Sequence, residues 1–337
     1  MVDLHLHLDG SLTTEDVFLL AEMSGVTLPC SDAETLRPML QAEPDCQSLG
    51  EYLEKFQLPL QVLQTEQTIT LAVYRLLKRL AEDGLVYAEI RFAPQLHLSR
   101  GLTQRQVVAA AVKGLNRGVS EFEIPAQLIL CCMRMADNQA ENEETVRVAK
   151  EFLGKGVCAV DLAGAEAAFP TEKFSDIFTL AGTLDVPLII HAGEAAGAQS
   201  VWTALDLGAR RIGHGVRSAE DAALMAILAK KKIPLEMCFT SNLQTKAVAN
   251  QEAYPLCRFL EQGICVTVNT DNMTVSGTDL VTEYRLLQKA FGLSGDALLQ
   301  LACNGAEAAF LTLEQKQQLK GQIRENFSLW LTKQRED

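Results

Sequence analysis

A short apolar run followed by an amphipathic helical pattern recurs along this 337-residue chain, and the repeat restricts the fold more than any other feature. The runs are rich in Val, Ile and Leu on both faces, as strands of a buried parallel sheet require. After a first strand at the N-terminus, they span residues 86–92, 127–133, 157–162, 187–191, 211–214, 234–238 and 265–270. Eight β-α repeats predict one α/β domain over residues 1–337, a closed (β/α)₈ TIM-type barrel without edge strands.

An open, doubly wound sheet is the alternative arrangement of the same repeat. Such sheets often carry a Gly-x-Gly-x-x-Gly turn after the first strand or a phosphate-binding loop. Neither pattern occurs in this sequence. We therefore favour the barrel.

The segment after the first strand is longer than one repeat needs and predicts extra helices. One helix is expected from about Thr14 to Ser24 and another, amphipathic one from Thr65 to Asp83. Between them, residues 28–48 are rich in proline and acids and look too irregular for a core element. We expect residues 28–62 to form a lid over the pocket, although a plain surface insertion fits the same pattern.

Composition excludes several classes of partner. The net charge of −13 and the lack of a basic stripe argue against nucleic acid. No run of about 18 apolar residues occurs, so we expect no membrane span. Nine scattered cysteines, an odd number, are typical of reduced thiols, and with no leader-like N-terminus they indicate a cytoplasmic protein. We expect a monomer, because no long apolar helix face is left without a use in the barrel.

The first strand carries two histidines two residues apart. Side chains in a strand alternate between faces, so His5 and His7 point one way while Leu4, Leu6 and Leu8 point the other. Taken alone, such a pair is either part of a metal site or two polar groups on a wet edge.

Polar residues gather at the carboxyl ends of the predicted strands, where barrel enzymes place their active sites. Four of the five histidines lie at such ends, and the fifth, His97, is expected at the surface or the pocket rim. In chain order the strand ends carry His5 to Gly10, Glu89 to Arg91, Met133-Arg134, Asp161 to Glu166, His191 to Glu194, Gly213 to Gly215, Thr240 to Asn242 and Asn269 to Asn272.

These strand ends contain a plausible metal-binding set with three nitrogen donors and one carboxylate. The set suits one zinc ion with a position left for water, whose pKa such an ion lowers to about 7. Its members are His5, His7, His191 and Asp271.

Two further residues suit acid–base chemistry. His214 lies between glycines, which let the backbone come close, and is a candidate base or orienter of water. Glu194 is a candidate general acid, for which an apolar pocket would have to raise its pKa. The alternatives are that Glu194 only orients a neighbour and that His214 is a fourth nitrogen ligand.

Together these motifs resemble the adenosine deaminases, particularly the bacterial ones, over essentially the whole chain. The resemblance implies hydrolytic removal of the 6-amino group of adenosine or 2′-deoxyadenosine, a small-molecule substrate, with one zinc ion per chain. The matching segments are His5-Leu6-His7-Leu8-Asp9-Gly10, Asp161-Leu162-Ala163-Gly164, His191-Ala192-Gly193-Glu194, Arg211-Ile212-Gly213-His214-Gly215, Thr240-Ser241-Asn242 and Asn269-Thr270-Asp271.

The resemblance also implies residue roles. The zinc ligands would be His5, His7, His191 and Asp271. The residue that orients the attacking water would be His214, and the acid that protonates purine N1 would be Glu194. Gly164 would offer its N–H to purine N3, and Asp9 would lie near the ribose hydroxyls. The residues in contact with substrate would then be His7, Asp9, Gly164 and Asn272.

One position departs from the family pattern. Asp271-Asn272-Met273 stands where the family usually has Asp-Asp-Pro. The second acid of that motif is expected to contact purine N7, an acceptor, and must be protonated to donate to it. An asparagine amide donates without any pKa shift, so we expect Asn272 to preserve purine recognition.

Related functions remain as alternatives. Adenine deaminases typically have a segment similar to His-Leu-Glu-Gly at the position of His7-Leu8-Asp9-Gly10 in this chain. The shorter acid leaves room for a ribose. Another 6-aminopurine is possible, but a nucleotide is disfavoured because the acidic chain shows no phosphate clamp. Residues 161–166 lack the lysine that would bridge two metals. A catalytically inactive nucleoside-binding protein is the alternative of a different class, and the complete set of ligands, acid and base argues against it.

Overall fold

The structure is a computed structural model that describes residues 1–43 and 46–333, so residues 44–45 and 334–337 of the predicted single domain and lid lie outside it. In the described residues, eight strands alternate with helices in the predicted order, which confirms the α/β class. The strands are β1 (Val2–His7), β2 (Tyr87–Phe92), β3 (Ala126–Arg134), β4 (Val157–Gly164), β5 (Ile189–Ala192), β6 (Arg211–His214), β7 (Leu235–Met237) and β8 (Val266–Val268).

Neighbouring strands pair in parallel, in two sheets with the orders β1-β2-β3-β4 and β5-β6-β7-β8. At one seam, the N–H of Asp271 donates to the carbonyl of His5 over 2.8 Å and its carbonyl accepts from His7 N–H over 2.7 Å. The ladder therefore continues from sheet to sheet, as a closed barrel requires. The parallel bridges that join the two sheets are Leu6 with Asp271 and Val160 with Leu188.

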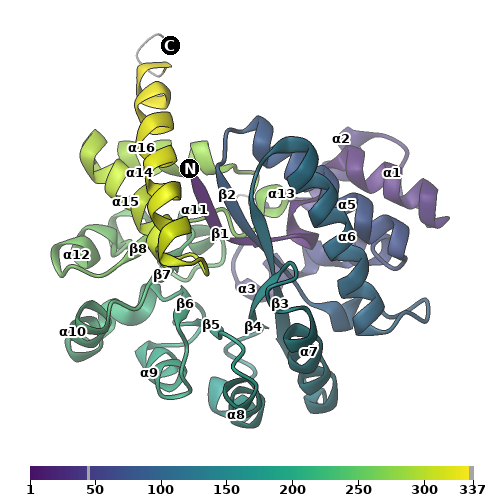
Figure 1. Ribbon diagram of the computed structural model, residues 1–337, viewed down its shortest axis with the longest axis horizontal. Helices are drawn as coiled ribbons and strands as arrows, with labels where there is room; N and C mark the ends of the chain where they lie inside the picture. The colour runs from purple at the N-terminus through teal and green to yellow at the C-terminus, as the bar shows by residue number, and fades with distance from the viewer. Residues whose placement is uncertain (44–45, 334–337) are drawn as a thin grey trace.

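Helices surround the strands on all sides of the view in Figure 1, with α16 extending beyond the barrel. The α-helices are α1 (Thr14–Ser24), α2 (Ala33–Leu40), α3 (Leu49–Leu53), α4 (Gln57–Val62), α5 (Glu66–Glu82), α6 (Gln104–Phe122), α7 (Gln139–Phe152), α8 (Ser175–Thr183), α9 (Ala198–Asp206), α10 (Ala222–Lys231), α11 (Phe239–Gln244), α12 (Leu256–Glu261), α13 (Met273–Ser276), α14 (Leu280–Phe291), α15 (Gly295–Ala308) and α16 (Leu313–Lys333). Short 3-10 helices are η1 (Asp9–Ser11), η2 (Glu54–Phe56), η3 (Pro94–Leu96), η4 (Thr171–Phe174), η5 (Val216–Glu220) and η6 (Gln251–Ala253).

Helices α1 to α5 lie between β1 and β2, as the long segment after the first strand predicted. The expectation that residues 28–48 hold no core element is wrong for α2. This helix begins after Asp32, whose side chain accepts from the N–H of Thr35. Its Leu36 and Leu40 are 0% and 1% exposed, because leucines four residues apart form one apolar face that packs beside α1 and α4.

The two faces of β1 differ in the way the alternation predicted. Leu4 and Leu6 are fully buried in the main hydrophobic core, while His5 and His7 turn to the site described below. Several strands carry buried charged residues that contact one another across the barrel, such as Glu89 on β2 and Arg211 on β6. Polar side chains therefore occupy part of the space that barrels usually fill with branched apolar ones.

The cysteines and the lengths of the helices bear on two predictions made from composition. All nine cysteines are free thiols, and six of them are buried. Within residues 1–43 and 46–333, no helix combines the length and the apolar character needed to cross a membrane.

Candidate active site

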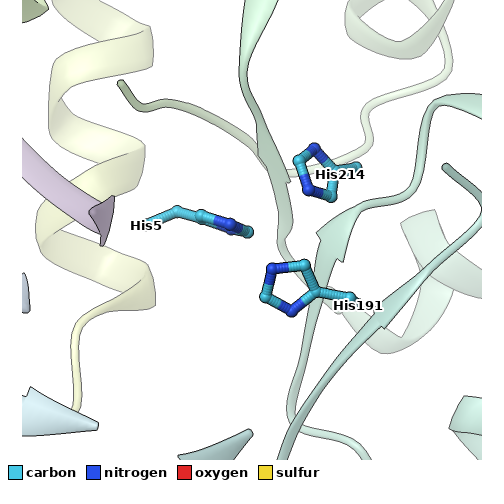
Figure 2. Close-up of side chains that lie close together, drawn as sticks. All are labelled: His5, His191 and His214. Atoms are coloured by element: carbon cyan, nitrogen blue, oxygen red, sulfur yellow. The ribbon is translucent and has the colours of Figure 1, made fainter. Parts of the chain in front are cut away.

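Four histidines meet at the carboxyl end of the barrel. His5 and His7 come from β1, His191 from β5 and His214 from the end of β6. Five of the six pairs of rings have centroids 4.5 to 5.4 Å apart. One nitrogen each of His5, His191 and His214 lies within 4.8 Å of the others, and Figure 2 shows these three rings turned toward one another.

Asp271 adds a carboxylate to this group. Its Oδ1 lies 3.3 Å from His5 Nε2 and 3.5 Å from His7 Nε2, and the hydroxyl of Ser241 donates to its Oδ2 over 2.6 Å. Burial alone would raise the pKa of Asp271, but the His5 imidazole close to it outweighs burial and holds this pKa well below its usual range. The carboxylate therefore stays ionised at neutral pH.

This donor set fits a metal ion. His5 Nε2 is buried and, among the described residues, has no well-directed hydrogen-bond partner, although Asp271 is near. Burial lowers the pKa of both His7 and His191, which keeps these imidazoles neutral and able to ligate. The four predicted ligands are thus brought together, and His214 is close enough to be an alternative nitrogen donor.

Two buried carboxylates hold the histidine rings from behind. Glu236 on β7 accepts from His5 Nδ1 over 2.9 Å, and Asp161 on β4 accepts from His191 Nδ1 over 2.9 Å. Arg91 joins the two carboxylates, with 2.8 Å from Nη1 to Asp161 and 2.8 Å from Nη2 to Glu236. Carboxylate partners of this kind fix the ring orientation and leave Nε2 free for a metal.

His214 is held in one tautomer by its neighbour. The Asn242 side-chain N–H donates to His214 Nδ1 over 2.9 Å, and the Asn242 oxygen accepts from Cys238 N–H, which is consistent with that amide orientation. Burial lowers the pKa of His214 well below its usual range, so the ring is neutral with its proton on Nε2. An Nε2–H suits a residue that orients water and stabilises developing negative charge, more than one that removes a proton.

Glu194 lies opposite the histidines, with Oε2 3.5 Å from His214 Nε2. Burial raises the pKa of this carboxyl group to about 8, with smaller contributions from the negative charges of Asp271 and Glu166. The group is therefore protonated at neutral pH. Glu194 thus has the protonation state that the general-acid interpretation needs.

A mostly apolar pocket connects these groups. Asp9 lines it and is buried, with no hydrogen-bond partner for Oδ1 among the described residues, and Gly164 at the end of β4 also lines it. Asn272 lies beside Gly10, where an added Cβ would stand 1.9 Å from the Asn272 Oδ1 atom. The glycine of the first motif is therefore needed for this close approach. The apolar lining comes from Leu49, Tyr52, Leu53, Phe56, Leu60, Ala93, Leu96, Cys131, Met133 and Ala163.

Two of the site residues have strained backbones. His214 and Asp271 both have φ of 60°, in the left-handed region that residues other than glycine seldom adopt. Such positions cost about 1–3 kcal/mol each and concentrate at functional sites. The barrel thus accepts backbone strain to aim both side chains at one point.

The expectation for His97 is wrong. This histidine is 1% exposed, its Nδ1 contacts the Leu63 carbonyl over 2.8 Å, and it is absent from the pocket lining. It is a core histidine that connects the loop after β2 to the end of α4.

Sequence reasoning assigned no role to several supporting residues. Arg91 and Glu166 were noted only as strand-end residues, and Asp161 was noted as a strand-end residue within a matching motif. Glu236 was not noted, although a charge in the middle of the buried run 234–238 is a signal that could have found it.

A model of the family described as adenosine deaminase matches residues 1–326. The chain is 50% identical over 331 residues to the adenosine deaminase of Haemophilus ducreyi, covering 97% of this chain and 96% of that protein. Among solved structures, it is similar to the adenine deaminase of Arthrobacter aurescens, with a TM-score of 0.88, 30% identity and 98% of both chains covered. An amidohydrolase of Burkhoderia ambifaria with bound Zn has a TM-score of 0.87 at 21% identity, covering 100% of this chain and 92% of that one, and shows the shared fold.

We predict that Glu236→Gln weakens metal retention by about 10- to 100-fold, because the neutral amide no longer fixes and polarises His5. Arg91 and Arg211 each keep another carboxylate, Asp161 and Glu89, so the fold should persist. Competition with a chelator for Zn²⁺ measures the affinity. Glu144→Gln, the same change at an exposed position of α7, is the control and should retain wild-type affinity. Equal affinities for the two variants would contradict the role of Glu236.

Proposed function

This chain belongs to the adenosine deaminase family, and we propose that its pocket carries out the reaction through the residues described above. The activity is hydrolytic deamination, in which adenosine and water give inosine and ammonia. The resemblance drawn from the sequence motifs is confirmed. The observation that carries the residue assignment is the convergence of four metal donors with a protonated Glu194 in one pocket.

Enzymes of this family depend on a metal ion, and we propose zinc, one ion per chain. Three imidazoles and a carboxylate are ligands that zinc favours, and a related amidohydrolase fold holds Zn. When bound, the ion supplies a water of lowered pKa as the nucleophile. The proposed ligands are His5, His7, His191 and Asp271.

The acid, Glu194, and the orienting residue, His214, face each other across a 3.5 Å contact. Glu194 gives its proton to purine N1, which makes C6 more electrophilic. His214, neutral with its proton on Nε2, donates toward the attacking water and stabilises the charge that develops there. C6 gains the oxygen of the water, and the two water protons go to the 6-amino group, which leaves as ammonia, and back to the Glu194 carboxylate.

Three contacts would set the substrate in place. The backbone N–H of Gly164 donates to purine N3, and the amide of Asn272 donates to N7. Asp9 accepts from ribose hydroxyls through its buried Oδ1, which has no partner among the described residues. A ribose that occupies this end of the pocket favours adenosine and 2′-deoxyadenosine over adenine.

We further propose that residues 28–62 act as a lid. Leu49, Tyr52 and Phe56 line the pocket from α3 and η2. The hydroxyls of Tyr52 and Ser276 form a hydrogen bond of 2.6 Å, which ties α3 to α13, directly after Asn272. This contact therefore joins the proposed lid to the short helix that begins after Asn272.

The reduced thiols support a cytoplasmic location, because exposed and buried cysteines persist unpaired there. We also propose that the protein binds the nucleoside and no nucleic acid, on the grounds of its acidic charge. We propose that it is a monomer that does not bind membranes, because no long apolar helix face is left without a use in the barrel and no long apolar run occurs in the sequence.

The primary test is turnover by the purified, zinc-loaded protein. Adenosine and 2′-deoxyadenosine should be converted to the hydroxypurines, as followed by ultraviolet absorbance, and adenine and a 6-methylated analogue should react more slowly. Removing the metal with a chelator should abolish turnover, and Zn²⁺ should restore it. Metal-loaded protein that converts no 6-aminopurine would refute the enzyme and favour a nucleoside-binding protein.

The pH dependence tests the acid. Glu194 donates only when protonated, so kcat/KM should be level near neutral pH and fall once the pH exceeds the pKa of Glu194, which burial raises to about 8. A bound cation would lower this pKa, so the fall should begin at or below about pH 8. Glu194→Gln should remove this fall and reduce kcat by on the order of 10²–10⁴-fold. An unchanged pH profile in that variant would assign the fall to another group.

Comparing Asn272→Asp and Asn272→Ala tests purine recognition. On adenosine, Asn272→Ala should lose about tenfold in kcat/KM, the value of one hydrogen bond, and it should lose little on 7-deaza-adenosine, which lacks N7. Asn272→Asp should donate only when protonated, so its loss on adenosine should grow as pH rises. If all three proteins discriminate the two substrates equally, the contact with N7 is wrong.

A further inference from the structure

Glu166 is a buried acid that neither the predicted roles nor the proposed reaction uses. It follows β4 and is 1% exposed. Its two oxygens accept five hydrogen bonds, and all five donors belong to the segment between β5 and the first turn of α9. The donors are the backbone N–H groups of Gly193 (2.8 Å), Glu194 (3.1 Å), Ala195 (2.7 Å) and Ala196 (2.9 Å) and the hydroxyl of Ser200 (2.6 Å).

Four consecutive N–H groups on one carboxylate define the path of the 193–196 loop. Glu194 belongs to this loop, which is not part of any strand or helix. On its other side, the carbonyl of Gly193 accepts from Arg217 N–H over 3.0 Å, and the carbonyl of Ala192 accepts from Gly215 N–H over 3.1 Å. The loop is thus fixed between Glu166 and the segment that follows His214.

A further chain of contacts fixes the oxygen atoms of Glu166. Because Ser200 donates its hydroxyl proton to Glu166, the Thr171 hydroxyl donates to Ser200 over 3.0 Å, and it accepts from Arg134 Nη2 over 2.9 Å. The same Nη2 donates to the carbonyl of His191 over 2.7 Å. The strand end that carries a proposed metal ligand and the loop that carries the acid therefore share one polar network.

We propose that Glu166 is a positioning residue for Glu194, a role that rests on the proposed function of Glu194 as the acid. The carboxylate fixes the Glu194 backbone so that its side chain faces His214 and purine N1. A misplacement of about 1 Å in such a group costs as much as 10²-fold in rate. All five groups that contact Glu166 are donors, so the position needs a side chain that only accepts, as a carboxylate does. Glutamine would not replace it, because its NH₂ would face N–H groups.

The test compares Glu166→Gln with Glu194→Gln and with the double variant, in the zinc-loaded full-length protein with adenosine. Glu166→Gln should lower kcat by about 10- to 100-fold and change KM by less than about threefold. In the Glu194→Gln background, the same substitution should cost less than about threefold more, because Glu166 acts through Glu194. Glu144→Gln, exposed on α7, should retain the wild-type kcat.

Hydrogen exchange gives a readout that does not depend on turnover. The amides of residues 193–196 should exchange faster in Glu166→Gln than in the wild type or the Glu144→Gln control. If Glu166→Gln does not fold, Glu166→Asp keeps the charge one methylene farther away, and its kcat should fall at unchanged KM.

The outcomes separate the two claims. Loss of activity in Glu194→Gln with wild-type kcat in Glu166→Gln, or in Glu166→Asp if only that variant folds, overturns the positioning role and leaves the acid role intact. If Glu166→Gln lowers kcat by the same factor in the Glu194→Gln background as in the wild type, the positioning role is also overturned, because Glu166 would then act independently of Glu194. Wild-type activity in Glu194→Gln overturns both.

Discussion

The salt-bridge network centred on Arg91 is the interaction on which the histidine site depends. Arg91 is fully buried and pairs with Asp161 and Glu236, the two carboxylates that orient His191 and His5. Burial would raise the pKa of Glu236, but the charges of Arg91 and Arg211 outweigh it and hold that pKa far below its usual range. A buried ion pair is weak evidence for stability, since desolvation offsets much of the attraction. Its value here is geometric, because it keeps two carboxylates charged behind two imidazoles.

Barrel closure brings the donors together. Asp271 follows β8 and exchanges backbone hydrogen bonds with His5 and His7 of β1, so the first and last strands meet at the site. Asp3 reinforces this seam, because its carboxylate accepts from the N–H and hydroxyl of Thr270, over 3.2 and 2.6 Å. Residues more than 260 positions apart therefore belong to one rigid element, and the left-handed conformation of Asp271 is held from both sides.

The sequence was sufficient for the strands and for the residues that end them. Alternation placed His5 and His7 on one face, and the parallel-strand rule placed His191, His214 and Asp271 at the same end, because these signals are local or topological. The burial of His97 was not predicted, because a loop histidine has no periodicity and its contact is the carbonyl of Leu63, directly after α4. The charge of Glu236 within a buried run is a local signal, but the roles of Glu236 and Glu166 could not be predicted locally. The partners of Glu236 lie on other strands and those of Glu166 lie in the loop after β5 and in α9, so only the fold shows that a buried charge has an arginine or a row of N–H groups facing it.

Burial places the proton of the Glu194–His214 pair on the carboxyl group. With ordinary pKa values of 4.5 and 6.5, the two groups would exchange that proton and form an ion pair, favoured by two pKa units or about 2.7 kcal/mol. In the pocket, burial raises the pKa of Glu194 to about 8 and lowers that of His214 well below 6.5, so the order is inverted. Glu194 keeps a proton, as its proposed role as the acid requires, and the imidazole stays neutral only while water is excluded. The apolar side chains of α3 and η2 that line the pocket therefore act on these protonation states by excluding water and lowering the local dielectric constant.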